Sequence, residues 1–380
     1  MRTCLFLLLS ILLLVSCGNQ QPKDLARAGA DAPVSELSLK HAKGFSVVDF
    51  ANYRRVEVYD PWQEGLIMGR YYLVSEATIP TPADGQRIVV PIKRMVTGST
   101  THYGFLSRLN QLESVVGVCD GKRIFQPHLR AGVASGSIVD LGDPFQMDVE
   151  KCMLLNPDLI MVSGYNQMDE HTKRLMSSGL PVVLNNEWME PTLLGRAEWI
   201  YFIACFFNQI DVAKALFDDT ERRYVALQQR VLNEVGHKPT VLSGDNFRGT
   251  WYQPGGRSYT AQLIRDAGGY YPYQADSSRG SIPMSFERVF FDLKNADVWV
   301  GVTNGKTKSE LLQNERRYEG FKPFQTDRMY AYTNRITEDG GNDFWEMAVA
   351  SPDGLLADFI HLFHPERLPN HTFLYVKKLP

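Results

Sequence analysis

The fold of this chain is decided by two stretches that follow one pattern: MDVEKCMLLNPDLIMV at residues 147–162 and MSFERVFFDLKNADVWV at residues 284–300. Each begins with a good helix cap, Asp148 or Ser285, because its side-chain oxygen can accept from the free amides of a first helical turn. A glutamate follows two positions later, where a carboxylate suits the positive end of a helix. Each stretch continues through an apolar, helix-like run to an aspartate that opens a short β-rich strand. The sequence therefore predicts the unit helix, short loop, strand once in each half of the chain.

The two copies match only approximately, because Glu150 and Asp158 lie closer together in the sequence than Glu287 and Asp297. Two related lobes would explain the repeat and would place one glutamate at an equivalent point on each lobe. Two unrelated αβ units that share a common cap pattern are the alternative.

The N-terminus has the pattern of a processing signal. Arg2 supplies a positive charge, and the apolar run at residues 5–15 is too short to span a bilayer. Small residues then lead to Cys17, which resembles a bacterial lipobox, where the cysteine becomes the lipidated first residue. We expect a lipoprotein signal peptide at residues 1–16 and a lipid-anchored tether at residues 17–43. An ordinary secretory signal with a coincidental cysteine is the alternative.

These features predict an exported chain that is anchored by lipid to a bacterial membrane and faces the periplasm, with a soluble globular part. The formal net charge of −3 offers no basic field for nucleic acid. The 380 residues, 44% of them hydrophobic, are enough for two cores of ordinary domain size.

Beyond the leader the cysteines are Cys119, Cys152 and Cys205. They cannot all pair, and no Cys-x-x-Cys spacing occurs, so neither a disulfide scaffold nor a thiolate zinc site is expected. A bridge between Cys119 and Cys152 is left open.

The front of the chain has the alternation of β-structure. Residues 44–75 alternate apolar and polar side chains and predict β-hairpins. Residues 88–96 predict the next strand, which Pro91 pushes toward a sheet edge or a bulge.

The longest helical stretch covers residues 192–235, with a break expected near residues 208–211. Asp211 is a good N-cap for the second part, which contains neither Gly nor Pro until Gly236. A helix of about 25 residues would be roughly 37 Å long. That length is enough to run along two lobes and join them, and one continuous helix predicts only small motions between the lobes.

Alternating strands and helices in both halves predict an α/β fold with two Rossmann-like lobes. Their central sheets are expected to be mainly parallel, and one long α-helix joins the lobes. An N-terminal β-hairpin extension is added in front. We assign residues 44–210 to the first lobe with its extension, residues 211–238 to the interlobe helix and residues 239–380 to the second lobe.

Ligands of open α/β sheets bind beyond the carboxyl ends of the strands. The candidates are therefore aromatic, arginine and amide side chains in the loops that leave the strands, many of them rich in glycine, since aromatics offer flat apolar faces and arginine offers charge and planar hydrogen bonding. The candidate ligand-binding residues are Tyr103, Arg123, Tyr165, Trp188, Asn246, Phe247, Arg248, Trp251, Tyr252, Arg257 and Trp345. As a set they suit a bulky, planar or anionic small molecule in an interlobe cleft. Packing of each side chain against its own lobe is the alternative.

Together with Val115-Val116-Gly117-Val118 and Asp140-Leu141-Gly142, the two repeated units resemble those of the substrate-binding proteins of ABC importers. The resemblance is to the class with a single interlobe helix, which serves ferric siderophores, haem and cobalamin, and it covers about residues 88–364. It implies that Glu150 and Glu287 bind basic pockets on the two permease subunits. A two-fold importer presents its pocket twice, so a pseudo-symmetric binder must present an acid twice.

The resemblance also implies the partners: a small-molecule metal chelate, a permease dimer with its ATPase subunits, and a membrane reached through the lipid anchor. The chain itself is expected to be a monomer with no cofactor of its own. Its front extension departs from the simplest members of the family.

The function expected is capture of an iron(III) chelate of the siderophore type and its delivery to the permease. Cobalamin is the nearest alternative, but a corrinoid needs few charges, and Arg123, Arg248 and Arg257 favour an anionic chelate. Haem is the third ligand, for which the possible axial ligands are Tyr103, Tyr165, Tyr252 and His102. The histidines are scattered, so no resident metal site is predicted.

An enzyme is not predicted, because no Gly-x-Gly-x-x-Gly follows the first βα strand and the chain has neither a Walker loop nor a Gly-x-Ser-x-Gly elbow. The acidic turn at residues 339–343 is interpreted as a turn only. A surface scaffold lipoprotein is the alternative of a different class. It predicts no small-molecule binding and no effect of replacing Glu150 or Glu287 on uptake.

Overall fold

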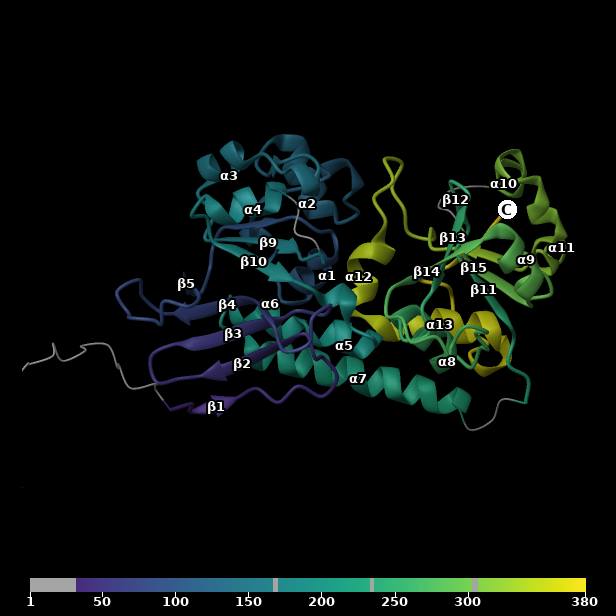
Figure 1. Cartoon of the computed structure of the whole chain (residues 1–380), viewed down its shortest axis with the longest axis horizontal. Coiled ribbons are helices and arrows are strands. Elements are labelled where there is room, and N and C mark those ends of the chain that lie inside the picture. The colour runs from purple at the N-terminus through teal and green to yellow at the C-terminus, as the bar shows by residue number, and fades with distance from the viewer. Residues whose placement is uncertain (1–31, 167–169, 233–235, 303–306) are drawn as a thin grey trace, which may run out of the picture.

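The computed structural model describes residues 32–166, 170–232, 236–302 and 307–380. Cys17, the expected signal peptide and the first part of the expected tether lie outside the described residues. Figure 1 shows two α/β lobes side by side, with helix α7 (Ile210–Leu232) running beneath both of them. The predicted fold class, two lobes with mainly parallel sheets joined by one long helix, is confirmed.

The first lobe is built on a five-stranded parallel sheet in the order β10-β9-β6-β7-β8. Alternate residues of its strands enter different apolar clusters, as Leu159 does on one face and Ile160 on the other. Burial on both faces is typical of parallel sheets covered by helices. The strands are β6 (Met95–Thr97), β7 (Val115–Val118), β8 (Val139–Asp140), β9 (Leu159–Ser163) and β10 (Val182–Asn185), and the helices between them are α1 (Thr101–Arg108), α2 (Pro127–Ser135), α3 (Val149–Leu155) and α4 (Glu170–Ser177).

The second lobe repeats this plan on a smaller sheet in the order β11-β15-β16-β17, in which only β17 is antiparallel to its neighbour. A separate antiparallel sheet of β12, β13 and β14 lies beside it. The strands are β11 (Val241–Ser243), β12 (Asn246–Phe247), β13 (Thr250–Pro254), β14 (Ser281–Ser285), β15 (Val298–Val302), β16 (Met329–Ala331) and β17 (Lys377–Lys378). The helices are α8 (Tyr259–Asp266), α9 (Phe286–Leu293), α10 (Lys308–Asn314), α11 (Lys322–Gln325), α12 (Asp343–Ala350) and α13 (Pro352–Phe363).

The predicted front extension forms a five-stranded sheet in the order β1-β2-β3-β4-β5, antiparallel except between β4 and β5. Its strands are β1 (Ser35–Glu36), β2 (Phe45–Asp49), β3 (Arg54–Tyr59), β4 (Ile67–Val74) and β5 (Gln86–Val89). The prediction of one strand at residues 88–96 is wrong, because the chain leaves this sheet after Val89 and joins the first-lobe sheet at Met95. Pro91 has no N–H to give to a ladder, and the Ile92 amide donates to the carbonyl of Phe206 instead.

Two buried glutamates attach the extension to the first lobe. The carboxylate of Glu198 accepts from the backbone amides of Lys40, His41 and Ala42 at 2.6–2.8 Å. The carboxylate of Glu190 accepts from the backbone amides of Lys43 and Gly44 at 2.9 and 2.8 Å. Because a buried carboxylate needs several donors, these bonds fix where the extension lies against the lobe.

The repeated units have the caps that the sequence predicts. Asp148 accepts from the Lys151 amide at 3.0 Å, and Ser285 accepts from the Arg288 amide at 3.2 Å. The helices α3 and α9 therefore begin in the same way.

The aspartates that close the two units also have the same role. Asp158 accepts from the amides of Lys93 and Arg94 at 2.7 and 2.9 Å, just before β6. Asp297 accepts from the Thr240 amide at 2.9 Å, just before β11. Each aspartate thus ties the start of its own strand to the start of the neighbouring parallel strand, which makes the two units structurally equivalent.

The helical stretch breaks where the sequence predicts. It consists of α5 (Leu193–Glu198), α6 (Ile200–Cys205) and α7, with Asn208 in the left-handed region at a φ of 55°. The prediction that Asp211 caps α7 is wrong, because α7 begins at Ile210 and Asp211 lies in its first turn. The carbonyl of Gln209 already accepts from the Ala213 amide, so Gln209 occupies the cap position.

The lobe boundaries expected from the sequence remain a prediction, because α5 and α12 each contribute side chains to the apolar core of the other lobe. Leu193 and Leu194 of α5 belong to an apolar cluster of the second lobe. Val349 and Ala350 of α12 belong to the main cluster of the first lobe.

Helix α12 packs closely against α1 of the first lobe. A Cβ atom on Gly104 would lie 2.2 Å from the carbonyl oxygen of Glu346, so only glycine allows this approach. The buried carboxyl group of Glu346 accepts from the amides of Phe125 and Gln126 in the first lobe, at 2.5 and 2.9 Å. Arg108 adds hydrogen bonds to α7 and to the carbonyl of Ala350. The lobes are therefore held by direct contact as well as by α7.

Burial raises the pKa of Glu346 from 4.5 to about 7, against the opposing effect of the two amides. In the unfolded chain the same carboxyl titrates near 4.5, so its stabilising contribution is complete below that pH and is lost as the pH rises through about 7. We expect this group to lower the free energy of unfolding by about 3 kcal/mol between pH 4.5 and pH 8. Urea unfolding of the wild type and Glu346→Gln across this range measures it. The glutamine variant should lack this component, and an identical pH dependence in both proteins would contradict the assignment.

Candidate functional site

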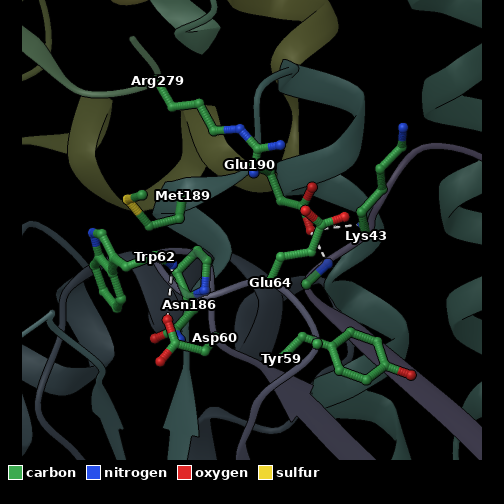
Figure 2. A pocket seen from close by; sticks show the side chains of 12 residues that line it. Lys43, Tyr59, Asp60, Trp62, Glu64, Asn186, Met189, Glu190 and Arg279 are labelled. Carbon is green, nitrogen blue, oxygen red and sulfur yellow. Dashed lines mark hydrogen bonds between the residues drawn. The ribbon is translucent and has the colours of Figure 1, made fainter.

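Cavities with walls from both lobes lie beside the segment that follows β10. The front cavity, of about 530 Å³, is lined by the extension, by the loop after β10 and by Arg279 of the second lobe. Figure 2 shows Arg279 entering from the side opposite Asp60, with Met189 and Glu190 between them. The side chains that line it include Lys43, Tyr59, Asp60, Trp62, Glu64, Asn186, Met189, Glu190 and Arg279.

The arginine cavity, of about 450 Å³, shares Arg279 with the front cavity, so the two are neighbours. Arg257, Arg265 and Arg279 line it, and no acidic residue does. Arg265 is held by the carbonyl of Gly256 and by Gln262. Arg257 and Arg279 are exposed and form no ion pair among the described residues. This cavity is suited to an anion.

The backbone holds these exposed arginines in place. The Arg257 amide donates to the carbonyl of Ser278 at 3.0 Å, and the Gly255 amide donates to that of Gly280 at 2.7 Å. The loops that carry Arg257 and Arg279 are thus joined to each other, which limits the reorganisation needed to bind a ligand.

Four aromatic side chains form a continuous row along the first lobe. The ring centroids are 5.9 Å apart between Trp62 and Trp188, 5.6 Å between Trp188 and Tyr165, and 5.2 Å between Tyr165 and Phe145. Tyr165 and Phe145 are 38% and 48% exposed. The buried indole N–H of Trp188 has no hydrogen-bond partner among the described residues, so it remains available as a donor. The neighbouring rings are tilted by 39–54° to one another, so the row offers a series of separate apolar ring faces beside the front cavity.

Trp188 belongs to the short 3₁₀ helix η4 (Glu187–Met189) after β10, and Tyr165 follows β9. Phe145 lies in η3 (Pro144–Gln146) after β8, and Trp62 follows β3 in the extension. Loops at the carboxyl ends of three parallel strands therefore build the row, as the rule for open α/β sheets predicts.

The candidate residues from the sequence divide into exposed, half-buried and buried residues, and not all of them lie in loops, since Phe247 and Tyr252 lie in strands and Trp345 lies in α12. Tyr165 and Trp188 contact each other, and Arg248 lies over the ring of Phe247 at 5.2 Å. Asn246 is half-buried, and its backbone N–H donates to the Tyr318 hydroxyl. The exposed candidates are Arg123, Tyr165, Phe247, Arg248, Tyr252, Arg257 and Trp345.

The expectation that Trp251 lines the cleft is wrong. It is fully buried in the second lobe, and its indole N–H donates to the carbonyl of Ser243 at 2.8 Å. Alternation along β13 explains its position, because Trp251 and Gln253 point inward while Tyr252 points outward. Trp251 is therefore a core residue and not part of a cleft wall.

Tyr103 and His102 lie in α1 and are also buried, at 1% and 0% exposure. Tyr103 lines a smaller rear cavity of about 360 Å³, bounded on the second-lobe side by α12. Burial lowers the pKa of His102 to about 3, so its ring is neutral. Neither side chain belongs to the aromatic row or lines the arginine cavity. The structure therefore gives no support to either of them as an axial ligand of a haem bound at those places.

The two glutamates expected to dock a partner lie at equivalent positions. Glu150 and Glu287 are each the second residue of their helices, and both are exposed. They differ in one respect: Arg317 donates to Glu287 at 2.7 Å, whereas Glu150 has no ion-pair partner among the described residues. A hydrogen bond from its own backbone amide and the Arg317 guanidinium hold the pKa of Glu287 below its usual value.

Several residues of the site were missed by the sequence analysis: Trp62, Phe145, Arg265 and Arg279. Trp62 lies in an extension that the strand-end rule does not cover, and Phe145 follows a strand of only two residues. Arg279 lies in a loop with no periodic pattern, so nothing local marks it.

The described residues contain no cluster of three or more metal-ligating side chains that could hold a metal ion. Cys119, Cys152 and Cys205 are free and buried thiols. None of the helices in the described ranges is long and apolar enough to cross a bilayer.

The fold and these interlobe cavities define a two-lobed α/β binding protein. The model of the periplasmic binding protein family matches residues 104–336, more than half of the chain, and the chain belongs to this family. A relative described as an uncharacterized lipoprotein of Methanocaldococcus jannaschii is 25% identical, with 90% of this chain and 87% of that protein covered.

Solved structures support the fold. A periplasmic haem-binding protein from Pseudomonas aeruginosa is 16% identical with a TM-score of 0.56, covering 76% of this chain and 98% of that one. A possible iron-binding periplasmic solute-binding protein from Staphylococcus epidermidis is 17% identical with a TM-score of 0.53, covering 72% of this chain and 99% of that one. The match to the family model begins at residue 104, after the front extension.

Proposed function

We propose that this chain captures an iron(III) chelate of the siderophore type between its lobes and delivers it to an ABC permease. The observation that carries the proposal is that an aromatic row and an arginine cavity both adjoin the front cavity, since Trp62 of the row and Arg279 of the arginine cavity line it. The row suits the aromatic or planar part of a chelate, and guanidinium groups suit its anionic oxygens. Structures with this fold include proteins described as haem-binding and as iron-binding, in keeping with such a ligand.

Charge distinguishes the ligand classes. A corrinoid would gain little from Arg257, Arg265 and Arg279, whose charges would be costly to bury without an anionic partner. Carboxylate or catecholate oxygens would form charge-assisted hydrogen bonds with the same groups. An anionic chelate therefore accounts for the arginine cavity better than cobalamin does.

Haem is the second candidate, and the position of Tyr165 favours it. This side chain is partly exposed within the aromatic row, where its phenol oxygen could bind iron while neighbouring rings contact the macrocycle. The haem carboxylates would then be the anionic groups for the arginine cavity.

We further propose that the chain acts on a membrane surface, held by lipid at Cys17 and facing the periplasm. The family to which it belongs and the relative described as a lipoprotein support this location.

The arginine pair provides the first test. We expect Arg257→Ala with Arg279→Ala to weaken binding of a ferric catecholate by about 100-fold, because each lost charge-assisted contact costs roughly tenfold. Tryptophan-fluorescence titration of the purified protein measures the affinity. The matched control is Arg174→Ala with Arg230→Ala, which removes two exposed arginines outside the cavities. Equal affinities in both double variants would contradict the role of the cavity. No binding of ferric catecholate, haemin or cyanocobalamin by the wild type would favour a scaffold.

The variant Tyr165→Phe distinguishes haem from a ferric siderophore as the molecule that the protein binds. The variant keeps the ring and removes the phenol oxygen, so a haemin site that uses this oxygen should lose at least about tenfold in affinity and change its absorption spectrum. Binding of a ferric catecholate, which fills its own iron coordination, should stay within about twofold. A haemin spectrum identical in both proteins would rule out Tyr165 as an axial ligand.

A further inference from the structure

The two large apolar side chains with the greatest exposure among the described residues are Leu154 at 87% and Phe291 at 78%. They occupy the same position in the two repeated units. Leu154 lies four residues after Glu150 in α3, and Phe291 lies four residues after Glu287 in α9. Residues four apart share one face of a helix, so each unit shows a carboxylate and an apolar side chain together.

The opposite face of each helix packs against its own lobe. Cys152 and Val289 are equivalent in the two units, and both are fully buried. The residue before each exposed apolar side chain is apolar as well: Met153 is 55% exposed in the first unit, and Phe290 is half-buried in the second. Both units thus have an inner face that the fold requires and an outer face of glutamate followed by apolar side chains.

A single exposed leucine or phenylalanine is ordinary on a protein surface. What requires an explanation is that both repeated units have a highly exposed apolar side chain at the same position. The caps, the buried positions and the aspartates at the strand starts all serve the fold, but side chains as exposed as Leu154 and Phe291 contribute little to a core. Their agreement points to contacts outside the chain.

We propose that each repeated helix carries a compound docking face, formed by a glutamate and an apolar side chain one turn later. The faces are Glu150 with Leu154 and Glu287 with Phe291, and they bind two equivalent subunits of one membrane partner. Each subunit offers a cationic group beside an apolar recess. The inference rests on the proposed function in taking that partner to be the permease. The carboxylates set the orientation and the rate of association, and the apolar side chains supply affinity because the partner buries them in the complex.

The faces are equivalent without being identical. Glu150 has no described ion-pair partner, whereas Glu287 must share or release Arg317 to bind a partner's cation. Phe291 in turn offers a larger apolar surface than Leu154. The first face therefore depends more on its carboxylate, and the second more on its ring.

Photo-crosslinking in the source cells tests the surface directly. A photoreactive residue is placed at 154 or 291 of the full-length anchored chain, with 212 and 232 of α7 as controls. Val212 and Leu232 are also exposed apolar residues, at 47% and 57%. We expect adducts with the same permease polypeptide from 154 and 291 and none from the controls. Adducts from neither position, adducts with unrelated proteins, or equal adducts from the controls would overturn the proposal.

A paired measurement separates this surface from ligand capture. Leu154→Ser with Phe291→Ser should leave the affinity for a ferric catecholate unchanged and reduce uptake of radioactive iron from that chelate at least about tenfold. Val212→Ser with Leu232→Ser should change neither quantity. Unchanged uptake in the first pair would contradict the docking faces. If the wild type binds no chelate, the proposed function fails, while the crosslinks still decide whether the faces bind a two-fold partner.

Discussion

The contact between α12 and α1 is the constraint on which the rest of the structure depends. Glycine at position 104 lets the two helices meet at their backbones, and the carboxyl group of Glu346 then accepts the amides of Phe125 and Gln126 across the lobes. A second lobe joined only through α7 would be free to tilt, because few other groups would oppose the motion. With α12 packed against α1, the loops that carry the arginines keep a fixed position relative to the loops that carry the aromatic row. The cavities between them are therefore formed before a ligand arrives.

The same contact between the lobes also fixes the distance between the two repeated units. Asp158 and Asp297 hold each repeated unit against its own central sheet, and the interlobe contact holds the two sheets relative to each other. The outer faces of α3 and α9 consequently keep a constant spacing. A partner with two-fold symmetry needs such a spacing, since both of its subunits must engage at once. Ligand capture and partner docking thus rely on one rigid frame, although they use different surfaces of it.

The sequence predicts the local features of this frame well and the long-range ones poorly. The caps at Asp148 and Ser285 and the break near Asn208 were predicted because each depends on a few neighbouring residues. Trp251 was misplaced because a five-residue strand between glycines gives too little alternation to show which side faces inward. The aromatic row joins Trp62 to Phe145 through two other loops, and no local pattern links segments so far apart. Glu346 likewise shows nothing in its own helix that would mark it as the residue that binds the other lobe.

The distance between the lobes, measured with and without ligand, decides whether the frame is fixed. Spin labels at Lys151→Cys in α3 and Arg288→Cys in α9 would report it by pulsed electron resonance, because both positions are exposed while Cys119, Cys152 and Cys205 are buried. Lobes held in a fixed frame should give one narrow distance distribution in the free protein and a shift of less than about 2 Å when a saturating ferric catecholate is added. A broad distribution in the free protein, or a larger shift on binding, would show that the lobes move as hinged bodies and would contradict the fixed frame.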